Sequence, residues 1–403
     1  MPYVAVHHLE KCRQCGACGE MVACPGAEEL ICIGCGACVL TCPHQALELV
    51  EAPREREVTV EINGKSATVP EQISVKDTLR EAGYQLAVSH REPGLFAPCE
   101  VGGCGSCAVE IDGVVKLACR TMVREGMRIG TELPEGYVPR RTVVNFQGHS
   151  MGGVGTPRQS QGNNGFYLEA VCFTAGCNLR CPHCQNWLIT YLGQDEALTP
   201  QEAARRLTMI REGLELNRMT VSGGESTLNR PWLTMFLREM KTLNPDPDAR
   251  FHIDTNGSLL IPDYLDELVD AGMTDIGIDL KALETDTFTR ITGLSDRNLA
   301  QNYKETAWEA VKYLINNYPE KVFVGVGIPY NRGFTSPSEI SRMGQRLFEI
   351  APSLQVTALN YRREFRSNIV KPKDMEMMVI RDILRDMGLK TVIVQTTAGN
   401  IGP

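Results

Sequence analysis

The sequence predicts an α/β fold, a partial TIM barrel of about six βα units, preceded by two small cysteine-rich modules. From Phe166 onward, apolar strand-like runs alternate with amphipathic helical stretches, and repeated βα units imply a parallel sheet. The first 120 residues hold twelve of the sixteen cysteines, in two dense groups. A chain of 403 residues has room for about two to four domains.

The strands of the predicted barrel are expected at 167–173, 217–222, 250–255, 275–280, 321–328, 354–360 and 391–395. A helix is expected over 199–207, between the first two strands, because Thr199 suits an N-cap and Pro200 the first helical position. In such barrels the chemistry lies at the carboxyl ends of the strands. We therefore expect the reactive residues there.

Composition restricts the partners and the compartment. The net charge of −8 argues against nucleic acid or an anionic membrane as the main partner. No apolar run reaches the roughly 18 residues needed for a membrane span. The first eight residues lack the charged and apolar parts of a signal peptide. Closely spaced CxxCxxC thiolates need a reducing compartment, so we expect a cytoplasmic location in an anaerobic or oxygen-avoiding cell.

The first cysteine group is an internal repeat within residues 1–52. Each half is a CxxCxxC triplet followed by a distant Cys-Pro, and in such repeats the distant cysteine ligates the cluster of the other half. One [4Fe–4S] cluster is therefore assigned to Cys12, Cys15, Cys18 and Cys42, and a second to Cys32, Cys35, Cys38 and Cys24. Zinc is the alternative for a CxxC pair, but two interlocked halves disfavour it. The segment resembles bacterial dicluster ferredoxins, which implies a small α+β domain.

A second module is expected at 53–138. Residues 58–62 alternate like a strand, Asn63-Gly64 is a hairpin signal, and Ser74 suits the N-cap of a short helix over 74–82. The C-x4-C-x2-C spacing with a distant fourth cysteine is the plant-type [2Fe–2S] pattern, formed by Cys99, Cys104, Cys107 and Cys119. The module resembles the [2Fe–2S] domain of succinate dehydrogenase and fumarate reductase iron–sulfur subunits, which implies a β-grasp fold.

Residues 139–165 are expected to be a glycine-rich linker. The runs at 147–155 and 161–165 offer few side chains that a core would bury. A flexible tether and an ordered connector are both compatible with this composition.

A third cysteine pattern has three members, Cys177-x3-Cys181-x2-Cys184 in the run CNLRCPHC. Three thiolates leave one iron of a [4Fe–4S] cluster without a protein ligand. By this spacing, residues 166–403 resemble the radical S-adenosylmethionine (SAM) superfamily. The resemblance implies that the open iron binds the methionine part of SAM, and that one electron cleaves SAM to a 5′-deoxyadenosyl radical that abstracts hydrogen from a substrate.

Two further groups extend this resemblance. Ser222-Gly223-Gly224-Glu225 follows the second strand and matches the family segment that binds the SAM amino group. Glycine allows close approach of the backbone, and a carboxylate suits an ammonium partner. His183 lies where relatives place an aromatic residue near adenine, so adenine packing and simple filling of the loop are both open.

Asp254-Thr255-Asn256-Gly257 and Asp279-Leu280-Lys281 resemble pyruvate formate-lyase activating enzyme and other glycyl-radical-enzyme activases. That resemblance implies a site for a monovalent cation at Asp254, Thr255 and Asp279, with Lys281 facing the pocket. The run 184–187, CQNW, resembles the radical SAM member of the AmmeMemoRadiSam system.

The remaining residues receive plainer interpretations. Cys172, inside the first strand, is expected to be a core thiol rather than a ligand. Trp187 is expected to shield the core or the cluster. The charged loop 361–366 is either solvated or supplies an arginine that anchors a substrate. No ligand spacing links the other histidines, which are His7, His8, His44, His90, His149 and His252.

The sequence therefore predicts an enzyme with SAM, three [4Fe–4S] clusters and one [2Fe–2S] cluster, acting on a protein or peptide. The extra clusters would exchange electrons with a low-potential donor or acceptor. Two alternatives remain open at this stage: a radical SAM dehydrogenase that passes electrons to the extra clusters, and a non-catalytic electron-transfer subunit.

Overall fold

The computed structural model describes residues 2–27, 31–150, 153–160 and 168–403. Its central feature is an open sheet that holds ten strands among these residues, in the order β12-β10-β11-β13-β14-β15-β16-β17-β18-β19. The strands are β10 (Arg141–His149), β11 (Glu169–Thr174), β12 (Ala197–Leu198), β13 (Arg218–Gly223), β14 (Arg250–Thr255), β15 (Asp275–Asp279), β16 (Phe323–Tyr330), β17 (Gln355–Asn360), β18 (Thr391–Thr396) and β19 (Gly399–Ile401).

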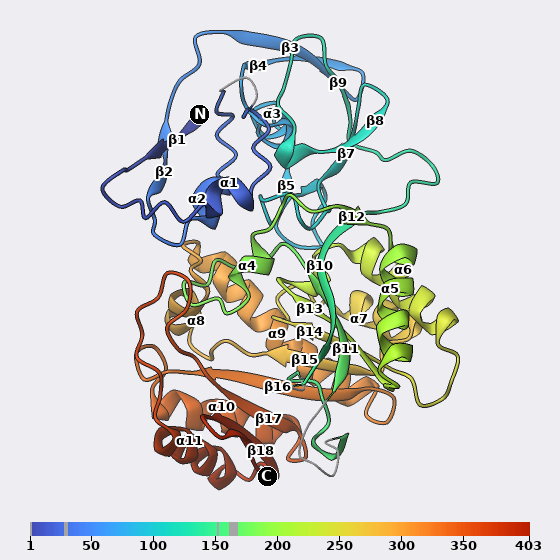
Figure 1. The fold of residues 1–403 in the computed structure, drawn as a ribbon, viewed down its shortest axis with the longest axis vertical. Helices are drawn as coiled ribbons and strands as arrows, with labels where there is room; N and C mark the ends of the chain where they lie inside the picture. Colours follow the sequence, from blue (N-terminus) through green and yellow to red (C-terminus); the bar gives the residue numbers. More distant parts are fainter. Residues whose placement is uncertain (1, 28–30, 151–152, 161–167) are drawn as a thin grey trace.

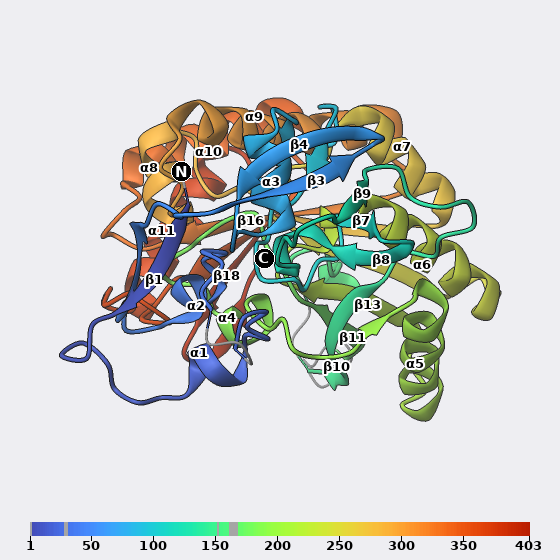
Figure 2. The same cartoon turned by 90° about the horizontal axis from the view of Figure 1, so that it is seen from above.

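The middle of this sheet is parallel, and its edges are not. Strands β11 and β13 to β18 run parallel, whereas β10, β12 and β19 pair antiparallel at the two edges. The expected α/β alternation is confirmed, and the parallel strands β11 and β13 to β18 begin and end within two residues of the predicted bounds, whereas the edge strands β10, β12 and β19 were not predicted. The long helices form an arc around the outside of the strands (Figure 2).

The helices of this part are α4 (Trp187–Thr190), α5 (Pro200–Gly213), α6 (Arg230–Leu243), α7 (Pro262–Ala271), α8 (Thr285–Thr292), α9 (Arg297–Asn317), α10 (Pro337–Ile350) and α11 (Asp374–Asp386). They bury large side chains against the sheet. Trp232 and Trp308 are almost fully buried, and Trp232 stacks on Phe236 at 5.0 Å between ring centroids. Burial of each such side chain contributes about 1.5–3 kcal/mol, so this core dominates the stability of the sheet.

Helix α5 begins as predicted, with Thr199 as its N-cap. The Thr199 side chain accepts a hydrogen bond from the Glu202 amide, and the Glu202 carboxylate accepts from the Thr199 amide at 2.8 Å. We expect Thr199→Ala to lower the free energy of unfolding by about 1 kcal/mol, because the Glu202 amide loses the hydroxyl that accepts its hydrogen bond. A denaturation midpoint equal to that of the wild type would contradict this assignment.

The predicted linker is wrong in its first part. Residues 141–149 form β10, which pairs with β11 from Val143↔Thr174 to His149↔Glu169. The β-branched and aromatic residues of the run RTVVNF favour a strand, and the glycines that follow do not cancel that preference. Residues 153–156 then pass beside β15 and β16, where an added Cβ on Gly155 would lie 2.3 Å from the Gly277 amide. These residues are an ordered connector, while 151–152 and 161–165 lie outside the described residues.

The first module combines a two-stranded antiparallel sheet, β1 (Tyr3–His7) and β2 (Leu47–Glu51), with two short helices, α1 (Ala17–Glu20) and α2 (Ala37–Thr41). Each helix follows a glycine in the left-handed region, Gly16 at φ 77° and Gly36 at φ 76°. These turns place Cys18 and Cys38 on equivalent helices of the two halves, as expected for the repeat.

The second module is a sheet in the order β4-β3-β9-β7-β8 with one helix against it (Figure 1). Its elements are β3 (Glu57–Ile62), β4 (Lys65–Pro70), α3 (Val75–Glu81), β5 (Leu86–Ala87), β6 (Leu95–Phe96), β7 (Ala108–Ile111), β8 (Val114–Leu117) and β9 (Arg128–Gly130). Asn63 and Gly64 both take positive φ, as a type I′ hairpin requires, and Ser74 caps α3.

Both modules share a hydrophobic core with the carboxyl ends of the main strands. Met21 and Val22 of the first module and Val101 of the second are buried with Leu179 and Tyr191. The modules are therefore packed onto the large sheet at the carboxyl ends of its parallel strands.

Within the described residues, the helices are too short or too polar to cross a bilayer.

Candidate active site

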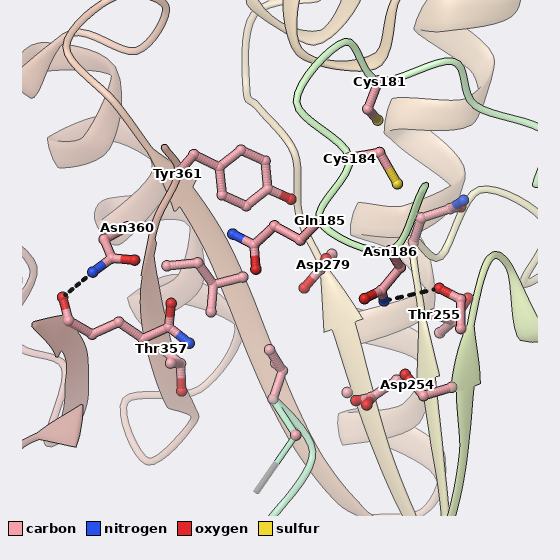
Figure 3. A pocket seen from close by; sticks show the side chains of 18 of the residues that line it. Cys181, Cys184, Gln185, Asn186, Asp254, Thr255, Asp279, Thr357, Asn360 and Tyr361 are labelled. Carbon is pink, nitrogen blue, oxygen red and sulfur yellow. Dashed lines mark hydrogen bonds between the residues drawn. The ribbon is translucent and has the colours of Figure 1, made fainter. Parts of the chain in front are cut away.

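The three cysteines of the CNLRCPHC run open onto a pocket of about 480 Å³ at the carboxyl ends of the parallel strands. Strand β11 ends at Thr174, and the loop that follows carries Cys177, Cys181 and Cys184 into the lining. We call these three residues the tripod. Figure 3 shows Cys181 and Cys184 on one side of the pocket and Tyr361, Asn360 and Thr357 on the other.

The tripod thiols are set up for a metal cluster. Burial raises the pKa of the Cys181 thiol to about 12 and also raises the pKa values of Cys177 and Cys184. These thiols therefore stay protonated near neutral pH unless iron supplies compensating positive charge. The Leu179 amide donates to Cys177 Sγ at 3.3 Å, a contact of the kind that stabilises a metal-bound thiolate.

The end of β13 and the residue that follows it contribute to the pocket. Ser222, Gly223 and Gly224 line it, and Gly223 has φ 118°, which a side chain would disfavour. An added Cβ on Gly224 would lie 2.2 Å from the Gly176 carbonyl oxygen, so only glycine lets this loop approach the tripod loop.

The expected contact between Glu225 and SAM stays a prediction. In this structure Glu225 is fully buried and is not among the residues that line the pocket. Its oxygens accept hydrogen bonds from four donors: the Thr227 amide at 3.0 Å, the Thr227 hydroxyl at 2.6 Å, the Thr255 hydroxyl at 2.6 Å and the Asn256 amide at 2.7 Å. The carboxylate is desolvated and satisfied, and it joins the segment after β13 to the end of β14.

Asp254 and Thr255 end β14 and both line the pocket, but each already has a partner. Asp254 Oδ1 lies 3.1 Å from Nε2 of His252, and the Thr255 hydroxyl donates to Glu225. His252 is completely buried, and its Nδ1 lies 3.2 Å from Glu169 Oε2. His252 received no role from the sequence, because it shows no ligand spacing. The structure places His252 between the carboxylates of Glu169 and Asp254, since the sheet brings β11 and β14 close together.

The same pattern recurs at Asp279. Lys281 Nζ donates to Asp279 Oδ2 at 2.7 Å and to the Tyr361 hydroxyl at 2.8 Å. Burial alone would lower the pKa of Lys281, but Asp279 holds it well above its ordinary value. The expected cation site at Asp254, Thr255 and Asp279 stays a prediction; in this structure the two aspartates pair with His252 and Lys281, side chains of the chain itself. Lys281 lines the pocket as expected.

The ion pairs beneath the pocket give a pH prediction. Burial would lower the pKa of His252, but Asp254 and Glu169 raise it to about 10, against an ordinary value near 6.5. Because the folded-state pKa is the higher one, this stabilisation is complete below about pH 6.5 and is lost as the pH rises toward 10. We expect the denaturation midpoint of the wild type to fall between pH 7 and 10, and that of His252→Gln to fall less. Exposed His7→Gln serves as the control and should follow the wild type; parallel curves for His252→Gln would contradict the prediction.

His183 is buried against Phe334 and Tyr361, with ring centroids 5.2 and 5.0 Å away. Burial, with the charge of Lys281, lowers its pKa to about 4, so the ring is neutral. Its Nε2 is buried without a hydrogen-bond partner and lies in the pocket lining. The pocket fits a [4Fe–4S] cluster at the tripod thiols. It also fits a polar organic ligand such as SAM, because Gly223 and Gly224 bring the backbone close to the tripod and Nε2 of His183 has no partner.

The far wall of the pocket contains residues that sequence reasoning missed. Asn360 ends β17, donates to the Gln395 carbonyl at 3.2 Å, and leaves its own buried Oδ1 without a partner. Thr357 and Gln395 line the same wall, and Gln185 of the CQNW run reaches toward it (Figure 3). A polar residue at the end of a buried strand was the available signal for these positions.

Comparison with family models identifies the three parts of the chain. Residues 171–333 match the model described as the radical SAM superfamily. The chain contains a radical SAM domain. Residues 55–134 match a 2Fe-2S iron-sulfur cluster binding domain, and residues 28–48 match a 4Fe-4S binding domain. The tripod and the pocket belong to the radical SAM domain, and both ferredoxin-like segments precede it.

Curated relatives match over part of the chain. GTP 3′,8-cyclase of Nostoc punctiforme is 35% identical over 127 residues, which are 30% of this chain and 37% of that protein. The Clostridium acetobutylicum enzyme of the same name is 30% identical, over 33% and 40% of the two chains. The Bradyrhizobium diazoefficiens enzyme is 25% identical, over 59% and 68%. The chain thus spans well under half the length of the first two relatives.

Solved structures with a similar arrangement include Streptococcus suis SuiB bound to S-adenosylmethionine, at a TM-score of 0.42 and 14% identity over 54% of this chain and 48% of that one. HemN of Escherichia coli, described as a coproporphyrinogen III oxidase and a radical SAM enzyme, has a TM-score of 0.32 and 16% identity, over 46% and 45%.

The cysteines ahead of the radical SAM domain gather as the repeat predicted. Burial raises the pKa of Cys18, and the next contribution comes from Cys42, followed by Cys15 and Cys12. Burial raises the pKa of Cys38 to about 12, with further contributions from Cys35, Cys32 and Cys24. Each triplet therefore lies beside the distant cysteine of the other half.

The four cysteines of the second module also converge. Cys99, Cys104, Cys107 and Cys119 are all buried, and Cys107 Sγ lies 3.3 Å from Cys119 Sγ. Cys172, by contrast, is completely buried in β11 among apolar residues of the main core, as expected for a structural thiol. Trp187 stacks on Phe365 at 5.1 Å and shields this side of the tripod.

Proposed function

We propose that the protein is a radical SAM enzyme that abstracts hydrogen from a protein or peptide and receives electrons through its own iron–sulfur modules. The observation that carries the proposal is the pocket: three cluster-forming thiols, without a fourth, open into the same 480 Å³ space as Ser222, Gly223, His183 and Lys281. When bound, SAM and the tripod cluster would supply a 5′-deoxyadenosyl radical. A pocket of this size lies within the usual range of about 300–1,000 Å³ for small-ligand sites.

The side chains of the pocket divide the remaining work. Gly223 and Gly224 keep the backbone close to the tripod, and Glu225 fixes that loop from behind. Lys281, held by Asp279 and Tyr361, offers a fixed cation to a ligand carboxylate. Neutral His183, stacked on Phe334, offers a ring and a free ring nitrogen to a nucleobase.

The far wall supports an amide-bearing substrate. Its polar groups are largely carboxamides and hydroxyls, from Gln185, Thr357, Asn360 and Gln395. Such groups pair with peptide N–H and C=O groups, both as donors and as acceptors. Two of the cations that line the pocket already have a carboxylate partner: Lys281 donates to Asp279 at 2.7 Å, and Arg362 donates to Glu364 at 3.3 Å.

A GTP substrate, which the names of the curated relatives suggest, is less compatible with these charges. A triphosphate needs a cluster of available cations, whereas in the pocket lining the carboxylates of Glu169, Asp254 and Asp279 equal in number the cations of Lys281, Arg362 and Lys371. We therefore propose the radical SAM chemistry that the family model supports, and not the substrate that the relatives' names suggest.

The test is an anaerobic assay of the protein with all clusters reconstituted. Addition of SAM and dithionite should yield 5′-deoxyadenosine and methionine. Absence of 5′-deoxyadenosine, with iron content and EPR signals showing complete clusters, would overturn the proposal and favour a pure electron-transfer subunit.

A dehydrogenase is the second candidate, because the two modules ahead of the radical SAM domain carry three further predicted cluster sites, which offer places for an electron removed from a substrate. It predicts that each SAM cleaved during turnover delivers an electron to the [2Fe–2S] or ferredoxin clusters. Turnover that consumes one external electron per SAM, with no cluster reduction, would exclude this candidate.

A further inference from the structure

The loop that carries the [2Fe–2S] cysteines lies directly against the tripod loop. Gly176 precedes Cys177 and has φ 87°, and an added Cβ there would lie 2.9 Å from Cys104 Cβ and 3.0 Å from Cys99 Cβ. From the other side, an added Cβ on Gly103 would lie 2.6 Å from Ala175 Cβ. The main chains of the two loops are therefore in van der Waals contact, which glycine at both positions makes possible.

Hydrogen bonds fix this contact from several directions. The Thr142 amide donates to the Gly103 carbonyl, the Asn229 side chain to the Cys104 carbonyl, and the Ser106 hydroxyl to the Leu228 carbonyl, each at 3.0 Å. Donors and acceptors thus come from β10, from the segment after Glu225 and from the [2Fe–2S] loop itself. The second module is docked in one orientation over the tripod.

Arg180 lies at the centre of the contact. It is one of the three residues between Cys177 and Cys181, and its side chain is only 19% exposed. Its guanidinium donates to the Cys177 carbonyl at 2.7 Å, to the Pro98 carbonyl at 2.8 Å and to Glu100 Oε2 at 3.2 Å. Pro98 and Glu100 flank Cys99, so one side chain joins a tripod cysteine to the neighbours of a [2Fe–2S] cysteine.

The positive charge of Arg180 interacts with both cysteine groups. Its guanidinium lies between the Cys177 carbonyl at 2.7 Å and the Pro98 carbonyl at 2.8 Å, with Glu100 as its ion-pair partner at 3.2 Å. A cluster gains negative charge on reduction, and a nearby cation stabilises the reduced form.

A second arginine extends the contact toward the ferredoxin module. Arg120 follows the [2Fe–2S] cysteine Cys119, and its Nη1 lies 3.7 Å from Cys35 Sγ. Cys35 belongs to the cysteine group of Cys24, Cys32 and Cys38. The other group meets the radical SAM domain elsewhere, where Arg366 donates to the Cys42 carbonyl at 3.0 Å.

We infer that the [2Fe–2S] centre is the direct electron-exchange neighbour of the tripod cluster, and that Arg180 is a positioning residue that favours the reduced state of both. In the step itself, the reduced [2Fe–2S] centre is oxidised by one electron and the tripod cluster is reduced by one. No bond is formed or broken, and a low-potential external reductant replaces the electron. This inference rests on the cluster assignments of the proposed function.

The test is an EPR-monitored redox titration of the full protein with all clusters present, comparing the wild type with Arg180→Gln, Arg180→Lys and Arg366→Gln. We expect Arg180→Gln to lower the reduced-to-oxidised ratio of the [2Fe–2S] and tripod clusters about tenfold at fixed potential, equivalent to about 59 mV for one electron. Arg180→Lys should restore part of this change, and Arg366→Gln should leave both clusters unchanged.

A second measurement uses no Arg180 variant. In the fully reduced wild type, the spin relaxation of the [2Fe–2S] signal should be faster than in Cys181→Ala, which lacks the tripod cluster. Equal relaxation in the two proteins would overturn the inference, as would an Arg180→Gln titration in which either cluster keeps its potential. SAM cleavage is measured separately. Cleavage without the titration and relaxation effects would overturn this inference alone, and those effects without cleavage would overturn the proposed function alone.

Discussion

Cys181→Ala should lose the tripod cluster and all formation of 5′-deoxyadenosine while keeping the other clusters. Two remaining thiols cannot hold a cubane that three held, and the alanine methyl leaves the polar side of the pocket unchanged. The measurements are iron content, which should fall by about four per chain because a [4Fe–4S] cluster is lost, and 5′-deoxyadenosine released with dithionite and SAM. The [2Fe–2S] EPR signal should keep its integrated intensity.

The control for this variant is Cys172→Ala, which removes a thiol nine residues upstream of Cys181. Cys172 is buried among apolar side chains of β11 and faces the main core. Its replacement should lower stability slightly through a small cavity, and should leave iron content and SAM cleavage at wild-type values. Equal loss of iron in both variants would indicate that the fold around β11, and not the tripod, had failed.

Glu225→Gln should reduce stability more than it weakens SAM binding. The carboxylate accepts four hydrogen bonds, and in an isosteric carboxamide one oxygen becomes an NH₂ group that faces a donor. We expect a loss of about 2–4 kcal/mol in the free energy of unfolding, because a buried donor is left unpaired beside a second donor. Chemical denaturation measures the loss of stability, and equilibrium binding of SAM to the folded protein measures the change in SAM affinity.

Glu212→Gln, on the exposed surface of α5, is the matched control and should be close to neutral. If Glu225→Gln folds with wild-type stability and loses SAM affinity, the carboxylate meets the ligand. That result would support the direct role that the motif suggests.

The sequence indicated the strands of the radical SAM domain because each is an apolar run closed by polar or glycine residues, as in 217–222 followed by Gly223-Gly224. It also located the cysteine groups, since their spacing is local. It could not indicate which side chains meet across strands. The four donors to Glu225 come from two loops, and His252 meets Glu169 across 83 residues. Motif residues therefore indicated where the pocket lies, while their partners depended on the sheet.

The strand β10 shows a second limit. Its residues are favourable for a strand, but the glycines after it suggested a linker, and only pairing with β11 decides between the two. The docking of the second module could not be predicted from the sequence either. Nothing in the residues around Gly103 and Gly176 indicates that the loops of these two glycines meet. Their importance follows from the loop that each one meets.

The core shared by all three parts bears on how such proteins can be shortened or recombined. Met21, Val22 and Val101 cover Leu179 and Tyr191, which would face water if the first 138 residues were removed. A truncated radical SAM domain should therefore aggregate, and a foreign ferredoxin joined by a simple tether should not replace the native one. Any exchange of modules between such proteins has to preserve this apolar contact surface, so the electron-transfer modules and the catalytic domain are constrained to change together.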